Sequence, residues 1–407
     1  MDITETIGLS VAAVSAALAM YAVVVSLPGY RNSRAEASMA HFKGLVRDLR
    51  EHHSLLTEAA YVDATDAWKP HGLHLLGDPA WILPTPVDLD QIELALQADP
   101  QSEPPEVERE RRRLLRSAGL RASPFRYSQA LQQSGLSPNI YDGKLYRILG
   151  ANAVATGLVL NLGLDSYFRY LDSSEVLALE AQQCSASGRS PNRGAYRRAL
   201  IGPSSFDRRV AALGIVTLTI RCSPSGATFF AHRRDGDVTH NHNLLGVAPA
   251  GEFAPSDLSL EAEDEDLDIW RTIMREYAEE FLGHPDAHRA GGAGINYESS
   301  EPYASLLSAR REGTLLVRAF GLATDPLTWK PCLLTVCVFD ALQFDAIFSG
   351  LVERNEEGDV ISRRGKLGIP FDGPSINRYI HDSRTTPDLK DCLRLAWKHR
   401  ELLGLDR

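Results

Sequence analysis

The sequence predicts an α+β sandwich with a single transmembrane helix at its N-terminus. Two observations predict the sandwich: strand patterns precede and follow one helical pattern after residue 206, and a second helix closes the chain. This order differs from the regular βαβ alternation of a parallel sheet. The third observation, about twenty uncharged residues near the N-terminus, predicts the membrane helix.

The composition is that of a globular protein with an excess of acids. The chain has 407 residues, of which 44% are hydrophobic and 24% charged, and its formal net charge is −10. Binding nucleic acid needs clustered Lys and Arg, so no nucleic-acid partner is expected. The five cysteines include no C-x-x-C pair, which argues against a disulfide framework or a zinc site.

The uncharged segment spans residues 7–27, and Pro28-Gly29 ends it. It is long enough to cross a hydrocarbon layer of ~30 Å. Acids precede it, and basic residues follow it: Arg31, Arg34, Lys43, Arg47 and Arg50. The positive-inside rule then places the rest of the chain in the cytoplasm. We expect a single-pass cell-membrane protein with residues 1–30 as its anchor, or else a buried helix or a cleaved signal.

Residues 31–122 are expected to form a helical and proline-rich linker. A helical pattern over residues 33–61 either stands off the membrane or pairs with a second copy in a homo-oligomer. Six prolines between residues 77 and 105 indicate a loosely packed connector. Residues 106–115 form a charged helix.

Residues 123–205 are expected to form a mixed α/β region without a chemical site. The apolar stretch over residues 146–162 predicts a buried helix or a pair of strands. Residues 174–183 predict a short helix, because Ser173 or Ser174 suits its N-cap.

The pattern is clearest over residues 206–347, with a helical extension over 348–407. The turn Pro224-Ser225-Gly226 joins two strands into a hairpin. The expected strands cover residues 211–220, 228–233, 244–248, 314–322 and 332–339. The expected helices cover residues 267–282 and 387–403.

The helix over residues 267–282 has an apolar face and an acidic face. The apolar side chains recur at helical spacing: Trp270, Ile273, Tyr277 and Phe281. Glu276, Glu279 and Glu280 stand at i, i+3 and i+4, so their carboxylates cluster. Like charges this close repel unless a cation binds them, and Mg²⁺ prefers oxygen ligands. The pattern predicts an Mg²⁺ or Mn²⁺ site, with a solvated acidic face as the alternative.

This helix and the segment before it resemble the Nudix hydrolase family, whose signature is G-x5-E-x7-R-E-U-x-E-E-x-G-U, with U apolar. The matching residues are Arg275, Glu276, Tyr277, Glu279 and Glu280. The stretch around Gly251 resembles the turn before the signature, and residues 229–234 resemble a strand that ends in an arginine near the substrate. The resemblance covers residues 206–347 and implies a Nudix-like α/β/α sandwich.

Two positions depart from the signature. Leu267 stands where the upstream Glu belongs, and Glu265, Asp266 or Asp268 takes that place only if the register shifts. The closing glycine is Gly283, one residue late.

The resemblance implies hydrolysis of a nucleoside diphosphate linked to another moiety. Glu276, Glu279 and Glu280 would hold the metal, and one of them or a loop acid would deprotonate the water. Arg275, four residues before Glu279, would orient the helix through an ion pair. Gly251 would permit the turn beside the substrate.

Other polar residues near this helix have two interpretations each. Arg233 and Arg234 contact a substrate phosphate or form a salt bridge at the strand end. His232, His240 and His242 fit loop polarity or substrate contact better than a metal site. The last three candidates form an ordinary exposed turn, which is the favoured interpretation, or supply the extra acid that Nudix enzymes often take from a loop: Glu353, Glu356 and Glu357.

A second functional class stays open. The chain also resembles Nudix-like modules attached to bacterial regulators, which implies a membrane-tethered sensor that binds a nucleotide without turnover and signals by oligomerising. The expected partners are thus a nucleotide-derived small molecule and the membrane. A structural scaffold is the third hypothesis.

Overall fold

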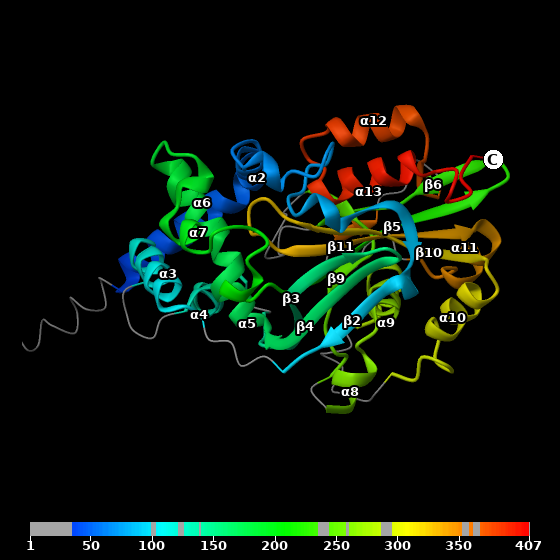
Figure 1. The fold of residues 1–407 in the computed structure, drawn as a ribbon, viewed down its shortest axis with the longest axis horizontal. Helices are drawn as coiled ribbons and strands as arrows, with labels where there is room; N and C mark the ends of the chain where they lie inside the picture. The colour runs from blue at the N-terminus through cyan, green and yellow to red at the C-terminus, as the bar shows by residue number, and fades with distance from the viewer. Residues whose placement is uncertain are drawn as a thin grey trace, which may run out of the picture.

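The chain folds around a seven-stranded mixed sheet (Figure 1). The structure, a computed structural model, describes residues 35–98, 103–120, 126–137, 140–234, 244–257, 260–285, 295–351, 358–360 and 367–406. The strands of this sheet are β1 (Ile82–Asp88), β10 (Leu315–Thr324), β11 (Pro331–Asp340), β5 (Gly214–Ser223), β6 (Gly226–Phe229) and β13 (Ile369–Pro370), with β9 (Ala250–Glu252) also paired to β5.

The three central strands combine both kinds of pairing. β10 and β11 form an antiparallel hairpin, whereas β11 and β5 run parallel. Successive side chains of a strand point to opposite faces, and both faces are apolar here. Ile215 and Leu333 join one core, and Val216 and Leu334 join the other. This explains why these strands read as continuous apolar runs in the sequence.

Helices cover both faces of this sheet. On one face lie α12 (Gly373–His381) and α13 (Pro387–Lys398). On the other lie α9 (Ile269–Glu276), α10 (Tyr303–Arg311) and α11 (Ala341–Ile347). The acidic helix of the sequence analysis is α9 together with the turn that continues it, η7 (Tyr277–Phe281).

Two smaller sheets flank the first one. β2 (Ile92–Leu96), β4 (Gly157–Ser166) and β3 (Lys144–Val154) form one of them, so the apolar stretch over residues 146–162 is a pair of strands. β12 (Gly358–Val360), β7 (Ala231–Arg234) and β8 (Leu245–Val247) form the other.

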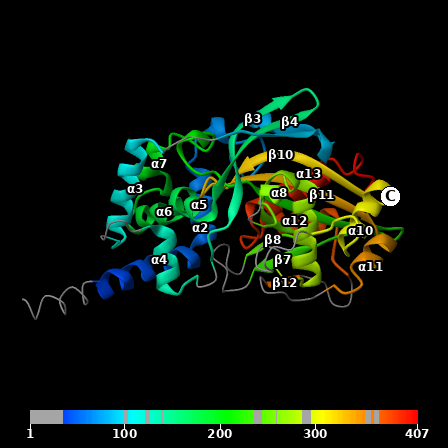
Figure 2. The same cartoon turned by 90° about the horizontal axis from the view of Figure 1, so that it is seen from below.

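Helices from the first half of the chain gather at one end of the molecule (Figures 1 and 2). They comprise a helix over residues 35–51, α2 (His53–Val62), α3 (Pro105–Ser117), α4 (Tyr127–Ser134), α5 (Tyr167–Tyr170), α6 (Val176–Ala186) and α7 (Ala195–Ala199). Single turns are η1 (Asp66–Trp68), η2 (Pro79–Trp81), η3 (Leu89–Gln91), η4 (Leu171–Glu175), η5 (Pro191–Arg193) and η6 (Phe206–Arg208), and α8 (Leu260–Glu265) precedes α9.

Part of the expected linker belongs to the central sheet. β1 lies between residues 77 and 105 and pairs with β10 as an edge strand. A bulge in β10 accommodates this approach at Gly321, whose φ is +136°. A Cβ at Gly321 would overlap the carbonyl oxygen of Trp81, so this position requires glycine.

The predicted membrane helix needs correction. Its segment, residues 7–27, lies outside the described residues. In the parts of the chain that the structure describes, no helix is long and apolar enough to cross a bilayer. The prediction of a transmembrane helix is therefore not supported, and neither is the predicted single-pass location at the cell membrane. The described fold is mixed α/β.

Candidate functional site

The acidic helix begins at an N-cap aspartate. The Asp268 carboxylate accepts hydrogen bonds from the backbone N–H groups of Trp270 (2.7 Å) and Arg271 (3.3 Å). Such a cap satisfies N–H groups that have no partner within the helix. The Asp268 side chain therefore stabilises the first turn of α9.

The predicted apolar face is confirmed. All four of its side chains are buried: Trp270, Ile273, Tyr277 and Phe281. The Tyr277 hydroxyl lies 2.7 Å from the hydroxyl of Thr219 on β5, and Thr219 donates to the carbonyl of Ala248 (2.6 Å). These contacts fix the helix against the sheet and the segment that leads into β9.

The late glycine follows from the shape of the last turn. Residues Tyr277–Phe281 form a π-helical turn, which spends more residues per turn than an α-helix. Gly283, with φ +69°, ends the helix in the left-handed conformation. The N–H groups of Gly283 and His284 donate to the carbonyls of Glu279 and Ala278. The wider turn delays the glycine without moving the glutamates out of the helix.

Gly251 and Glu276 lie in direct contact. A Cβ added at Gly251 would overlap the Glu276 carboxylate, so glycine is what lets this carboxylate rest on the backbone of β9. Glu276 is half-buried. The turn glycine and the first glutamate, matched separately to the signature, are thus brought together by the fold.

Glu280 reaches the same strand from the next turn of the helix. Its Oε1 accepts a hydrogen bond from the N–H of Ala250 (2.9 Å). Its Oε2 lies 3.7 Å from Nδ1 of His232 on β7, and both side chains are buried. Glu279 is half-buried. Glu276 and Glu280 therefore both face β9, and Glu280 also faces a histidine.

The described residues contain no ready-made cluster of three or more His, Cys, Asp or Glu side chains that could hold a metal. Mg²⁺, however, is usually held by one or two carboxylates and completes its shell with water and substrate phosphates. The two carboxylates at β9 fit that mode, since Glu276 contacts the backbone at Gly251 and Glu280 accepts from the N–H of Ala250, the preceding residue. Magnesium or manganese at this site stays a prediction.

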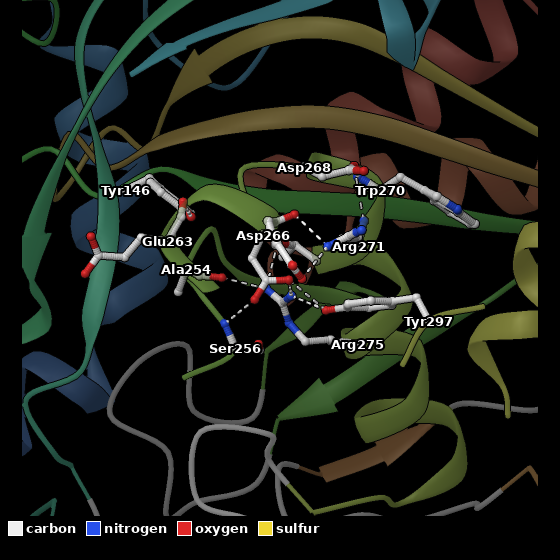
Figure 3. Close-up of polar contacts among 12 residues, drawn as sticks. Tyr146, Ala254, Ser256, Glu263, Asp266, Asp268, Trp270, Arg271, Arg275 and Tyr297 are labelled. Atoms are coloured by element: carbon white, nitrogen blue, oxygen red, sulfur yellow. Dashed lines mark hydrogen bonds and ion pairs between the residues drawn. The ribbon is translucent and has the colours of Figure 1, made fainter. Parts of the chain in front are cut away.

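Arg275 forms a buried ion pair with Asp266 (Figure 3). Its Nη1 lies 3.1 Å from Asp266 Oδ1 and donates to the Tyr297 hydroxyl (2.6 Å). Its Nη2 donates to the carbonyl of Ala254 (2.6 Å). Burial alone would lower the pKa of Arg275, but Tyr297 and Asp266 raise it above its ordinary value. Arg275 is therefore charged and tied to the segment that follows β9.

This ion pair shows which acid faces Arg275. Asp266 has a buried carboxylate that also accepts from the Ser256 N–H (2.7 Å) and the Tyr297 hydroxyl (3.0 Å). Leu267 packs against the core instead. Of the three acids considered as substitutes for the upstream glutamate, Asp266 takes the position beside Arg275. The expected brace between Arg275 and Glu279 stays a prediction.

Of the remaining candidates, Arg233 and the backbone of Arg234 belong to β7. The Arg233 side chain is exposed there, whereas the Arg234 side chain lies outside the described part. His240 and His242 also lie outside it, as do the three glutamates between residues 352 and 357. Tyr297, which the sequence analysis did not select, comes from a distant segment with no motif around it.

The comparisons with known proteins add no relative. No protein-family model matches the chain, and no curated protein matches it. The Nudix resemblance thus rests on the residues themselves.

Proposed function

We propose that the chain binds a nucleoside diphosphate linked to another moiety, together with Mg²⁺ or Mn²⁺, beside β9 and hydrolyses its diphosphate. The contact between Gly251 and Glu276 carries this proposal. The resemblance implies a turn beside the substrate at Gly251 and a metal ligand at Glu276, and these two residues, far apart in the sequence, lie in contact.

The three glutamates would have different roles, because they differ in how exposed they are. Glu276 and Glu279 are half-buried and within reach of a ligand, whereas Glu280 is buried and oriented by the Ala250 N–H. When bound, the metal would polarise a phosphate oxygen and lower the pKa of a water. Glu280 is our candidate for the group that accepts the proton of that water, because its position is fixed before substrate binds.

Arg275 acts in this proposal as a positioning residue. It joins α9 to Asp266 and to the carbonyl of Ala254, which follows β9 in the chain. A helix held this way keeps its glutamates at a constant distance from β9. Such rigidity is what a phosphate-transfer site needs, because most of its catalysis is positioning and charge stabilisation.

The test uses the full chain and a panel of nucleoside diphosphate derivatives with Mg²⁺. Both turnover and binding are measured for the wild type, Glu280→Gln and Glu265→Gln. Glu265 is the matched control, because its side chain is 73% exposed and the same charge is removed. We expect Glu280→Gln to lower turnover by about 10²–10⁴-fold while Glu265→Gln changes it little.

The second candidate is a nucleotide sensor that binds without turnover. The observation that favours it is the departure from the signature at Leu267 and Gly283. Binding of a panel member that depends on Glu276 but yields no product would support this candidate. If no panel member either binds or reacts, both candidates are wrong.

A further inference from the structure

A cavity lined by arginines lies in the part of the chain that precedes β5. Its volume is about 130 Å³, and none of its lining residues belongs to α9, η7 or β9. Six of the lining residues are arginines and three are acids. The arginines are Arg111, Arg126, Arg147, Arg169, Arg208 and Arg209. This local excess of positive charge opposes the net charge of −10 of the whole chain.

Arg209 is the arginine of this cavity whose positive charge is least compensated. Its side chain is 97% buried, since its relative exposure is 3%. It donates to three carbonyls, those of Pro203, Ser205 and Trp329, and forms no ion pair with any carboxylate among the described residues. Its Nε has no hydrogen-bond partner there either.

A buried cation without a counter-ion is costly. Burial is the main cause that lowers the pKa of Arg209 to about 9, and the neighbouring charge of Arg147 contributes to that shift. Carbonyl dipoles offset part of this cost, but only an anion can neutralise the charge.

The neighbouring carboxylates do not balance the arginines. Arg147 and Arg169 share one buried carboxylate, that of Asp165, at 3.4 Å and 3.1 Å. Glu103 is occupied by a two-bond contact with Arg111. Arg208 is paired with Glu106, so Asp165, Glu106 and the three lining acids set five carboxylates against the six arginines, and the cavity keeps a net positive charge.

The size and the donors of the cavity indicate its ligand. A cavity of ~150 Å³ is large enough for benzene, so one of about 130 Å³ takes a phosphate group. The planar fork of a guanidinium matches two phosphate oxygens at once. Arg126 and Arg169 are exposed and stand where a ligand enters from solvent.

We infer that this cavity is a binding site for a phosphate-bearing small molecule. The site is separate from the glutamates of α9 and η7, and the inference does not depend on the proposed diphosphate chemistry.

The experiment measures thermal unfolding of the full chain with increasing inorganic phosphate, at an ionic strength held constant with sodium chloride. A ligand that binds the folded state raises the unfolding temperature with its concentration. The test variant is Arg126→Gln with Arg169→Gln, since both side chains are exposed and Asp165 keeps Arg147 as its second ion-pair partner. The matched control is Arg112→Gln with Arg113→Gln, two exposed arginines of α3 outside the cavity lining.

Phosphate should raise the unfolding temperature of the wild type and of the control alike. Calorimetric titration with phosphate then measures the affinity directly. The affinity of the test variant should be at least tenfold weaker than that of the wild type. Equal phosphate affinity in the wild type and the test variant would overturn the inference. So would the absence of any phosphate effect on the wild type, or an equal loss in the control variant.

Discussion

Asp266 and Arg275 form an ion pair whose two side chains are almost fully buried, with 3.1 Å between Arg275 Nη1 and Asp266 Oδ1. The pair connects the residue that follows α8 to the last turn of α9, and the Tyr297 hydroxyl forms hydrogen bonds with both partners. It therefore determines how the acidic helix lies against the strand that precedes it.

We predict that Asp266→Asn lowers the free energy of unfolding by about 3–5 kcal/mol, because it leaves a buried guanidinium without its counter-charge. Chemical denaturation measures this change. Asp268→Ala is the comparison, since it removes only a helix cap worth about 1 kcal/mol. If both variants lost the same free energy of unfolding, the ion pair would contribute no more to stability than a helix cap does.

A change at Gly251 should affect ligand binding far more than stability. In Gly251→Ala the new methyl group displaces the Glu276 carboxylate, which is the flexible end of a side chain. We expect the free energy of unfolding to change by less than about 1 kcal/mol and Mg²⁺-dependent nucleotide binding to weaken about tenfold, which is 1.4 kcal/mol. Gly246→Ala on nearby β8 is the control, because a Cβ there meets only an ordinary contact at 3.7 Å. Unchanged binding in Gly251→Ala would count against the proposed site.

The bulge in β10 should be intolerant of a side chain. Gly321→Ala combines an unfavourable φ with an overlap on the Trp81 carbonyl, and we expect a loss of about 1–3 kcal/mol or more. Gly313→Ala has a positive φ of 74° but open space around it, so it isolates the cost of the backbone conformation. Thermal unfolding of both variants should rank Gly321→Ala as clearly less stable.

His399 should make stability fall in mild acid. Burial, and then the charge of Lys398, lower the pKa of His399 in the folded state. The unfolded chain therefore takes up the proton first as the pH drops below about 6.5. The stability contribution is complete above that pH and is lost as the pH falls through the folded-state pKa. Denaturation curves at several pH values should show that the free energy of unfolding depends less on pH in His399→Leu than in the wild type.

The elements that could be predicted from the sequence are those in which the spacing of apolar residues follows from which faces are buried. The runs around Val216 and Leu334 are apolar on both faces because helices cover both faces, so they read clearly as strands. The acidic helix was predicted for the same reason, since Tyr277 and Phe281 repeat at helical spacing against one core.

Other features are set by contacts that no local pattern encodes. β1 contains Pro84 and Pro86, which an edge strand tolerates but which indicate a linker when read from the sequence. The partner of Arg275 could not be chosen among Glu265, Asp266 and Asp268 by spacing alone. Only the course of the chain between α8 and α9 decides it.

The position of β1 also limits how this protein can be divided. β10 is an inner strand only because β1, far upstream in the sequence, covers its edge. A fragment that begins at residue 206 would retain Gly251 and the acidic helix but would present the backbone of β10 to other chains, which is a known route to aggregation. The region that begins at residue 206 therefore depends on β1 to complete its sheet and is not a self-sufficient unit.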